Sequence, residues 1–238
     1  MNDNLIDLNF CTQNVRSLNI ASKNIITEQK IHAVTKNGCN IVFLSDLRLN
    51  SLKQIVACKE ISQKFYFRGY KFIHNSPASS RGVGILVKRT VLEKISIVNI
   101  VRDTDGNYIL IDIEYKNNRY TLGSVYGANT NEGISMYDAL EKDLANLKNE
   151  KIILGGDWNA TYDRSDVNIN IDTLNMVNIP SLRRSNRIHA MCNNFSLIDP
   201  YRMLYPDTRD YTFHQWVKIK LIDPDLTFFL SQTFCLNL

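Results

Sequence analysis

Compact polar groups follow four apolar segments of the chain, and their residue types suit chemistry on a phosphate group. They are Gln13-Asn14, Ser45-Asp46, Tyr126-Gly127-Ala128-Asn129 and Gly156-Asp157-Trp158-Asn159. A single aspartate or asparagine after a strand often only starts a turn or caps a helix. Four such groups of complementary chemistry are harder to explain in that way, because strand ends present side chains rigidly at the open edge of a sheet.

These side chains meet the needs of metal-assisted phosphodiester hydrolysis. Asp46 is a hard oxygen ligand, of the kind that Mg²⁺ prefers together with water and phosphate oxygens. Asp157 could orient or deprotonate an attacking water, while Asn14 and Asn159 could donate hydrogen bonds to a phosphate oxygen as its negative charge builds. Tyr126 offers a phenol to the same site. We therefore predict that Asp46 binds Mg²⁺ or Mn²⁺ and that the other four residues are catalytic.

The hydrophobic pattern predicts the elements that position these groups. Strands are expected at 5–14, 41–44, 70–74, 83–87, 95–101, 108–115, 119–126, 151–154, 211–213 and 226–231. Helices are expected at 27–37, 135–149 and 187–194, and a long surface loop at 163–180. Many strands joined by hairpin turns, with a few helices between them, favour an α/β fold with two packed sheets over one parallel doubly wound sheet.

Composition limits the class of protein. The 238 residues contain 44% hydrophobic side chains and show no repeat or linker, which favours one domain. The net charge of +4 tolerates a polyanion such as DNA without requiring one. The five cysteines form no CxxC pair and no zinc spacing, so we expect small buried side chains in a reducing compartment. Without a signal-peptide pattern or a bilayer-length apolar run, we expect an intracellular protein that contacts no membrane. We also expect a monomer.

A resemblance to a known family adds to this interpretation. The ordered motifs QNVRS, IVFLSDLRL, GVGILVK, SVYGANT and IILGGDWNA resemble the endonuclease/exonuclease/phosphatase superfamily, which has the DNase I-like fold. Within it, the chain is most similar to the apurinic-type endonuclease domains of LINE-type non-LTR retrotransposons. The resemblance covers residues 5–231, and GGDWN is its most specific motif.

The resemblance implies a four-layer α/β sandwich of two mixed β-sheets flanked by helices. It also implies a magnesium-dependent endonuclease that nicks double-stranded DNA in the nucleus, with a reverse transcriptase domain in the intact polyprotein. Asp46 would replace the family's metal-binding glutamate, and Tyr126 and Asn129 would line the substrate groove. Asn14 would sit in the phosphate site, Asp157 would orient the nucleophilic water, and Asn159 would contact the scissile phosphate.

The last two family elements do not match. The family strand Arg-hydrophobic-Asp-Phe-Phe-Leu-Ser aligns with residues 225–231, where Thr227 replaces the catalytic aspartate and Asp225 the arginine. No Ser-Asp-His occurs before Leu238, and surface or core roles are expected for His32, His74, His189 and His214. Since losing a positioned acid-base group typically costs about a hundred- to ten-thousand-fold in rate, we expect an impaired domain that lacks its last catalytic segment.

Candidate DNA contacts are the arginines near the strand ends and a later basic cluster. They are Arg16, Arg48, Arg81, Arg183, Arg184 and Arg187, with Trp216 as a residue that could insert beside a base step. The competing explanation is that these are ordinary solvated charges and a core tryptophan.

Two alternatives to a DNA endonuclease stay open. The chain could be a DNA-binding or structural remnant of the same domain without catalysis. A lipid or inositol phosphatase has less support, because the basic residues are scattered as for an extended polyanion.

Overall fold

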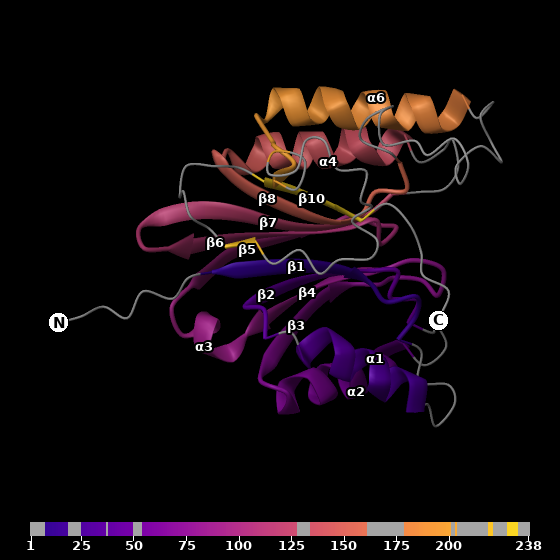
Figure 1. The fold of residues 1–238 in the computed structure, drawn as a ribbon, viewed down its shortest axis with the longest axis vertical. Helices are drawn as coiled ribbons and strands as arrows, with labels where there is room; N and C mark the ends of the chain where they lie inside the picture. Colours follow the sequence, from indigo (N-terminus) through magenta and orange to yellow (C-terminus); the bar gives the residue numbers. More distant parts are fainter. Residues whose placement is uncertain are drawn as a thin grey trace.

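Two five-stranded sheets pack face to face, and helices cover the outer face of each (Figure 1). The structure is a computed structural model that describes residues 8–18, 25–36, 38–49, 54–127, 134–160, 179–200, 203, 219–220 and 228–232. In this part of the chain, no helix is long and apolar enough to cross a membrane. The four layers confirm the predicted α/β sandwich with two mixed sheets.

The first sheet carries the N-terminal half of the site. Its strand order is β3 (Tyr70–Asn75), β4 (Val83–Lys88), β2 (Ile41–Ser45), β1 (Asn9–Asn14) and β9 (Ile219–Lys220). Strands β1 and β2 are parallel, and the other neighbouring pairs are antiparallel. Helices α1 (Ile25–Lys36) and α2 (Gln54–Phe67) cover its outer face (Figure 1). The short helix α3 (Arg89–Leu92) follows β4.

The second sheet carries the other half. Its strand order is β10 (Phe228–Gln232), β8 (Lys151–Asp157), β7 (Asn118–Tyr126), β6 (Tyr108–Tyr115) and β5 (Ser96–Arg102). Strands β7, β8 and β10 run parallel, while β5, β6 and β7 form an antiparallel meander. Helices α4 (Ile134–Leu147) and α6 (Ile179–Asn194) cover its outer face (Figure 1).

The apolar runs of the central strands are explained by burial on both faces. Ile109, Ile111 and Ile113 of β6 belong to the core between the sheets, whereas Leu110 packs under the outer helices. A third cluster fills the space between the first sheet and helices α1 and α2. Three layers of apolar contacts therefore hold four layers of structure.

Two contacts bring the sheets close together near the carboxyl ends of β2, β7 and β8. The Ser124 hydroxyl of β7 donates a hydrogen bond of 2.8 Å to the Leu44 carbonyl of β2. Gly155 of β8 lets the Phe43 ring lie against its backbone, since a Cβ at Gly155 would stand 2.4 Å from that ring. The spacing between the sheets is therefore fixed at the edge where the polar groups lie.

Most predicted elements agree with the structure, but the last helix starts earlier than predicted, and helices α2 and α3 and strand β9 were not predicted. Strand 211–213 lies outside the described residues. The last helix starts at Ile179, not at residue 187, so the end of the predicted loop is wrong, and most of that loop is not described. Helix α2 was not predicted, although Ala57, Ile61 and Phe65 form a buried stripe at a spacing of four. Exposed apolar neighbours such as Phe67 hide that stripe in the sequence.

A methyl group at Gly156 should destabilise the fold strongly. The Cβ of alanine at this position would lie 1.9 Å from the Val125 carbonyl oxygen, which belongs to the neighbouring strand and cannot move aside alone. We expect Gly156→Ala to lower the free energy of unfolding by more than about 3 kcal/mol in urea titrations. Gly38→Ala is the control, because its φ of +65° gives strain but its Cβ meets no described atom within 4 Å. A similar loss in both variants would contradict the packing argument.

Candidate active site

The ends of the parallel strands bring the predicted polar groups to one edge of the sandwich. Strand β1 ends at Asn14 beside the last residue of β2, and β7 ends at Tyr126 opposite Asp157. The Asn14 side-chain amide donates a hydrogen bond of 2.7 Å to Asp157 Oδ2, which joins the two sheets. Asp46 follows β2 directly, and Asn159 follows β8 after one residue. The structure therefore brings all five predicted catalytic and metal-binding residues together.

Asp157 is a buried carboxylate with two hydrogen bonds and a raised pKa. Its Oδ1 accepts a bond of 3.1 Å from the Asn159 backbone amide, and its side chain is almost wholly buried. Burial raises the pKa of the Asp157 carboxyl to about 6, the Asp46 charge adds to this, and the bonds from Asn159 and Asn14 lower it. A carboxylate whose pKa lies near neutral is suited to accept a proton from water.

Asp46 is fully buried, and among the described residues only one of its two carboxylate oxygens has a hydrogen-bond partner. Its Oδ1 accepts a hydrogen bond of 2.6 Å from Arg48 Nε. Its Oδ2 is buried and receives no hydrogen bond from any described residue. The backbone of Asp46 is left-handed, with a φ of +60°, and its carbonyl accepts a bond of 2.7 Å from the Ser17 amide. An unpaired buried carboxylate oxygen costs free energy, which a cation beside it would recover.

This donor set fits a magnesium ion held through a single protein carboxylate. Mg²⁺ commonly takes one or two carboxylates and fills its other positions with water and phosphate oxygens. Among the described residues, no group of three or more His, Cys, Asp or Glu side chains is arranged as a metal cage. An ion at Asp46 Oδ2 would therefore leave most of its ligand positions to water and substrate.

Arg48 links Asp46 to Tyr126. The hydrogen bond to Asp46 raises the pKa of Arg48, whose guanidinium also lies beside the Tyr126 phenol. Burial raises the pKa of Tyr126, the charges of Asp46 and Asp157 raise it further, and Arg48 lowers it. Tyr126 thus keeps its proton and can act as a hydrogen-bond donor. Arg48 was predicted as a DNA contact, and the structure places its Nε on the candidate metal ligand.

The segment after β8 is fastened to the segment after β7. The Gly127 amide donates a hydrogen bond of 2.7 Å to the Asp157 carbonyl. The Asn159 side-chain amide in turn donates a hydrogen bond to the Gly127 carbonyl. The Tyr137 hydroxyl of α4 donates 2.8 Å to the Trp158 carbonyl. A Cβ at Gly127 would lie 2.1 Å from that same carbonyl oxygen. Gly127 and Tyr137 thus position Asn159, although their partners were not predicted from the sequence.

Three cations surround the two carboxylates. Lys30 of α1 donates hydrogen bonds of 2.6 and 3.0 Å to the Arg16 and Ser17 carbonyls. Burial lowers the pKa of Lys30, and the Asp46 charge opposes that change. Arg16 lies close enough to Asp157 to lower the pKa of its carboxyl. Lys30, Arg16 and Arg48 outnumber the two carboxylates, so the edge favours an anion. Lys30 was missed because nothing in its local sequence marks it.

Arg81 lies on the same edge, next to the end of β7. Its Nη1 donates a hydrogen bond of 2.8 Å to Asn107 Oδ1. The Asn107 backbone carbonyl accepts a hydrogen bond of 2.7 Å from the Tyr126 amide. The Asp103 carboxylate accepts bonds of 3.1 and 2.8 Å from the backbone and side-chain amides of Asn107. The Arg48 backbone amide donates a hydrogen bond of 2.9 Å to the Arg81 carbonyl. A DNA contact by Arg81 stays a prediction, but its side chain is held by Asn107, the residue whose carbonyl pairs with the Tyr126 amide.

The three predicted DNA-binding arginines of α6 do not form one basic surface. Arg187 Nε forms an ion pair of 2.6 Å with the Asp138 carboxylate of α4, and Arg187 Nη2 pairs with the Glu141 carboxylate of the same helix. Arg184 is buried, and its charge lowers the otherwise raised pKa of Tyr137. Only Arg183 is exposed to solvent. Arg187 therefore joins two helices, and Arg184 points toward the core of that layer.

Asn129, Trp216 and Thr227 lie outside the described residues, so their predicted roles are not placed. The strand after Thr227 is described as β10, which runs parallel to β8. Its first residue, Phe228, pairs with Ile153, and its last, Gln232, pairs with Asp157. The residue of β10 that pairs with Asp157 therefore lies five positions after Thr227 in the sequence.

The described histidines and cysteines have structural surroundings. His32 is exposed on α1, and the half-buried ring of His74 stacks on Phe72 at 4.9 Å between centroids. His189 is half-buried on α6. The four described cysteines are free thiols, and all but one are buried, as predicted: Cys11, Cys39, Cys58 and Cys192, of which Cys58 is half-buried.

Comparison with known proteins identifies the family. The family model "Endonuclease/Exonuclease/phosphatase family" matches residues 11–218, which include every residue that forms the site. The chain belongs to this family.

Solved structures agree with the fold. An AP endonuclease from Archaeoglobus fulgidus superimposes with a TM-score of 0.62 at 16% identity, over 92% of this chain and 83% of that one. A 3′ phosphatase from Neisseria, bound to a product DNA hairpin, gives 0.62 at 18% identity over 87% and 79%. The endonuclease domain of TRAS1, a telomere-specific non-LTR retrotransposon, gives 0.51 at 13% identity over 80% and 73%. At these identities the likeness establishes the fold alone.

The raised pKa of Asp157 predicts a pH-dependent stability. Below about pH 4 the carboxyl is protonated in both states; between the unfolded value of 3.8 and the folded value of about 6 only the unfolded chain ionises. The contribution of Asp157 to stability is therefore lost as the pH rises through this range, by on the order of 3 kcal/mol.

Urea unfolding with a chelator present, at pH 4 and pH 7, tests this. In Asp157→Asn, the free energy of unfolding should no longer fall between pH 4 and pH 7 by the amount that Asp157 contributes. The new amide would face the Asn14 amide, but this effect is the same at every pH. Equal slopes in the wild type and Asp157→Asn would rule out the raised pKa.

Proposed function

We propose that this chain is a metal-dependent DNA endonuclease domain of a non-LTR retrotransposon that nicks one strand of its target. The observation that carries the proposal is the pair of buried carboxylates at one sheet edge. Asp157 is held by Asn14 across the two sheets, and Asp46 keeps one oxygen open. One carboxylate can hold a cation while the other serves as a base, which is the division of labour that phosphodiester hydrolysis needs.

The residues of this chain supply positioning, proton transfer and charge stabilisation. Asp157 would orient the attacking water and accept its proton, with Asn14 holding the carboxylate in place. Asn159, fixed to Gly127, and the protonated Tyr126 would donate hydrogen bonds to the phosphate oxygens. A magnesium ion on Asp46 would supply Lewis-acid stabilisation of the charge that develops on the phosphate.

The choice of DNA as substrate rests on charge and on relatives. Lys30, Arg16 and Arg48 leave the edge positive, and Arg81, bonded to Asn107, adds a fourth cation near the end of β7. Among proteins of the same fold are an AP endonuclease and a phosphatase bound to a DNA hairpin. The retrotransposon context, with a reverse transcriptase partner and action in the nucleus, rests on the order of the sequence motifs, and the fold of TRAS1 is compatible with it.

Plasmid nicking tests the catalytic proposal. Because the last catalytic segment of the family is not matched in this chain, we expect the purified chain to convert supercoiled plasmid to the open-circular form only slowly with Mg²⁺. We expect Asp157→Ala to lower that rate further, by about a hundred- to ten-thousand-fold. The exposed loop residue Asp105 gives the control Asp105→Asn, which should keep wild-type activity. Activity that survives Asp157→Ala would refute the assignment.

A non-catalytic DNA-binding domain is the second candidate function. It is favoured by Thr227, which stands in the sequence where the family has its aspartate. A chain that binds duplex DNA but does not nick it with Mg²⁺ or Mn²⁺ would establish this candidate in place of the endonuclease.

Metal binding should stabilise the fold through Asp46. A cation that binds only the folded state at a hundred times its Kd adds about 2.7 kcal/mol to the free energy of unfolding. We expect Mg²⁺ or Mn²⁺ to raise the Tm of the wild type in thermal scans, and Asp46→Asn to abolish the increase. Asp105→Asn should respond as the wild type does, and a retained increase in Asp46→Asn would place the ion elsewhere.

A further inference from the structure

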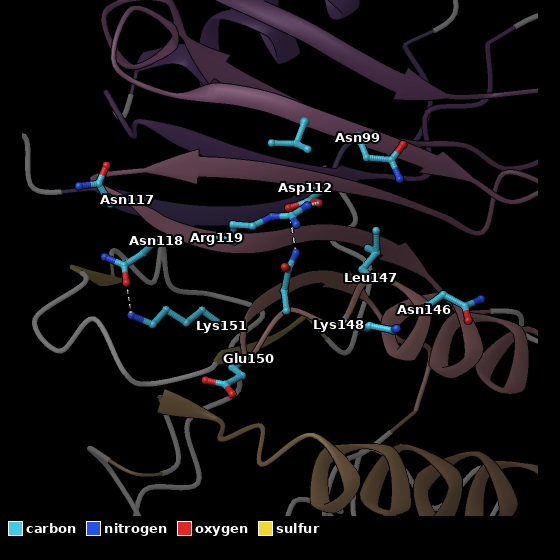
Figure 2. Close-up of a pocket in the computed structure, with 12 residues that line it drawn as sticks. Asn99, Asp112, Asn117, Asn118, Arg119, Asn146, Leu147, Lys148, Glu150 and Lys151 are labelled. Carbon is cyan, nitrogen blue, oxygen red and sulfur yellow. Dashed lines mark hydrogen bonds and ion pairs between the residues drawn. The ribbon is translucent and has the colours of Figure 1, made fainter.

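A hollow of about 690 Å³ opens at the end of the second sheet opposite the candidate active site (Figure 2). Residues from β5, from the β6–β7 turn and from the α4–β8 turn surround it, and we call it the distal pocket. It adjoins Lys151, where β8 begins, whereas the candidate site lies where β8 ends at Asp157. Six residues at about 3.3 Å each separate the two along the strand, a distance of about 20 Å.

A buried carboxylate forms the floor of the distal pocket. Asp112 interrupts the apolar run of β6 and is almost wholly buried. Its Oδ1 accepts a bond of 2.8 Å from the Asn149 side-chain amide, and its Oδ2 pairs with Arg119. Asn149 also donates 2.9 Å to the Thr121 hydroxyl (Figure 2 shows the pocket residues of this network). The network holds Arg119 in place, while 51% of its side chain is exposed to solvent.

The rim adds cations on rigid turns. The Lys151 ammonium donates a hydrogen bond of 2.9 Å to Asn118 Oδ1 and lies over the Tyr120 ring. Lys148 is exposed, and it directly follows α4 with a left-handed backbone conformation. The β6–β7 turn is a two-residue hairpin in which Lys116 and Asn117 both have positive φ. Such turns have little freedom, so the cations and amides around the pocket are pre-positioned.

The lining chemistry narrows the ligand. Most residues that line the pocket are polar or cationic. The asparagines are Asn99, Asn117, Asn118, Asn146 and Asn149, and the cations are Arg119, Lys148 and Lys151. The lining also contains two acidic residues, Asp112 and Glu150, and two apolar ones, Val98 and Leu147. A lipid or another apolar ligand would find little surface to bury. Carboxamides offer both donors and acceptors, which match the edges of a nucleobase, and Arg and Lys match a phosphate.

We propose that the distal pocket binds a nucleoside phosphate, with the phosphate near Lys148 and Arg119 and the base among the asparagine side chains. Its volume lies in the range of about 300–1,000 Å³ that is usual for small-molecule sites. The ligand is either a free nucleotide or one unit of a single strand. The candidate active site lies about 20 Å away along β8, so this is a second site with its own occupancy.

An NMR titration of the full chain tests the proposal. Adenosine monophosphate and a single-stranded deoxyadenosine oligonucleotide are added separately to isotope-labelled protein with a chelator present. Chelation removes divalent ions, so the result does not depend on whether the chain is an active endonuclease. We expect shifts at Asn146, Lys148 and Asn149, and we expect Lys148→Glu to weaken binding at least about tenfold because it reverses a charge at the phosphate.

Lys142→Glu is the matched control, since Lys142 is an exposed residue of α4 that does not line the pocket. It should change the Kd less than twofold. Equal affinity for the two probes assigns a free nucleotide, and tighter binding of the oligonucleotide assigns a strand; both support the shared chemistry. No shift with either probe at millimolar concentration would overturn the proposal. So would equal weakening by the two variants, or shifts confined to the edge of Arg16 and Arg48.

Discussion

One hydrogen bond holds the candidate site together: the Asn14 amide of the first sheet donates to the Asp157 carboxylate of the second. A bond of 2.7 Å between side chains on different sheets requires a fixed distance between those sheets. Gly155 and the Ser124–Leu44 bond set that distance at the same edge. The packing of the sandwich and the geometry of the site are therefore the same property, and a change in the spacing of the sheets acts directly on the chemistry.

The cost of this arrangement is buried charge. Asp46 and Asp157 are both withdrawn from water, the Asp46 charge raises the pKa of Asp157, and one oxygen of Asp46 has no described donor. Arg48 offsets part of this for Asp46, and the amides of Asn14 and Asn159 do so for Asp157. A site that is imperfectly balanced without its ligand has free energy to gain when a cation and an anionic phosphate arrive.

The core of the site could be predicted from the sequence because its residues follow four apolar strands that form two parallel pairs, β1 with β2 and β7 with β8, and parallel strands bring such ends to one edge. Asn14, Asp46, Tyr126, Asp157 and Asn159 are all found there. The supporting residues could not be predicted, because their partners are distant in sequence. Arg187 pairs with Asp138 of another helix, and Arg81 is held by Asn107 from another sheet. Sequence proximity suggested a basic cluster on α6 that the helix geometry separates.

The left-handed backbone of Asp46 has a consequence for which acid can occupy that position. Aspartate and asparagine adopt positive φ more readily than most side chains do, because their short polar groups can bond locally. A glutamate would extend the reach of the carboxylate by one methylene but would fit this backbone less well. The shorter acid and the unusual turn are therefore coupled traits, and lineages would be expected to exchange one only together with the other.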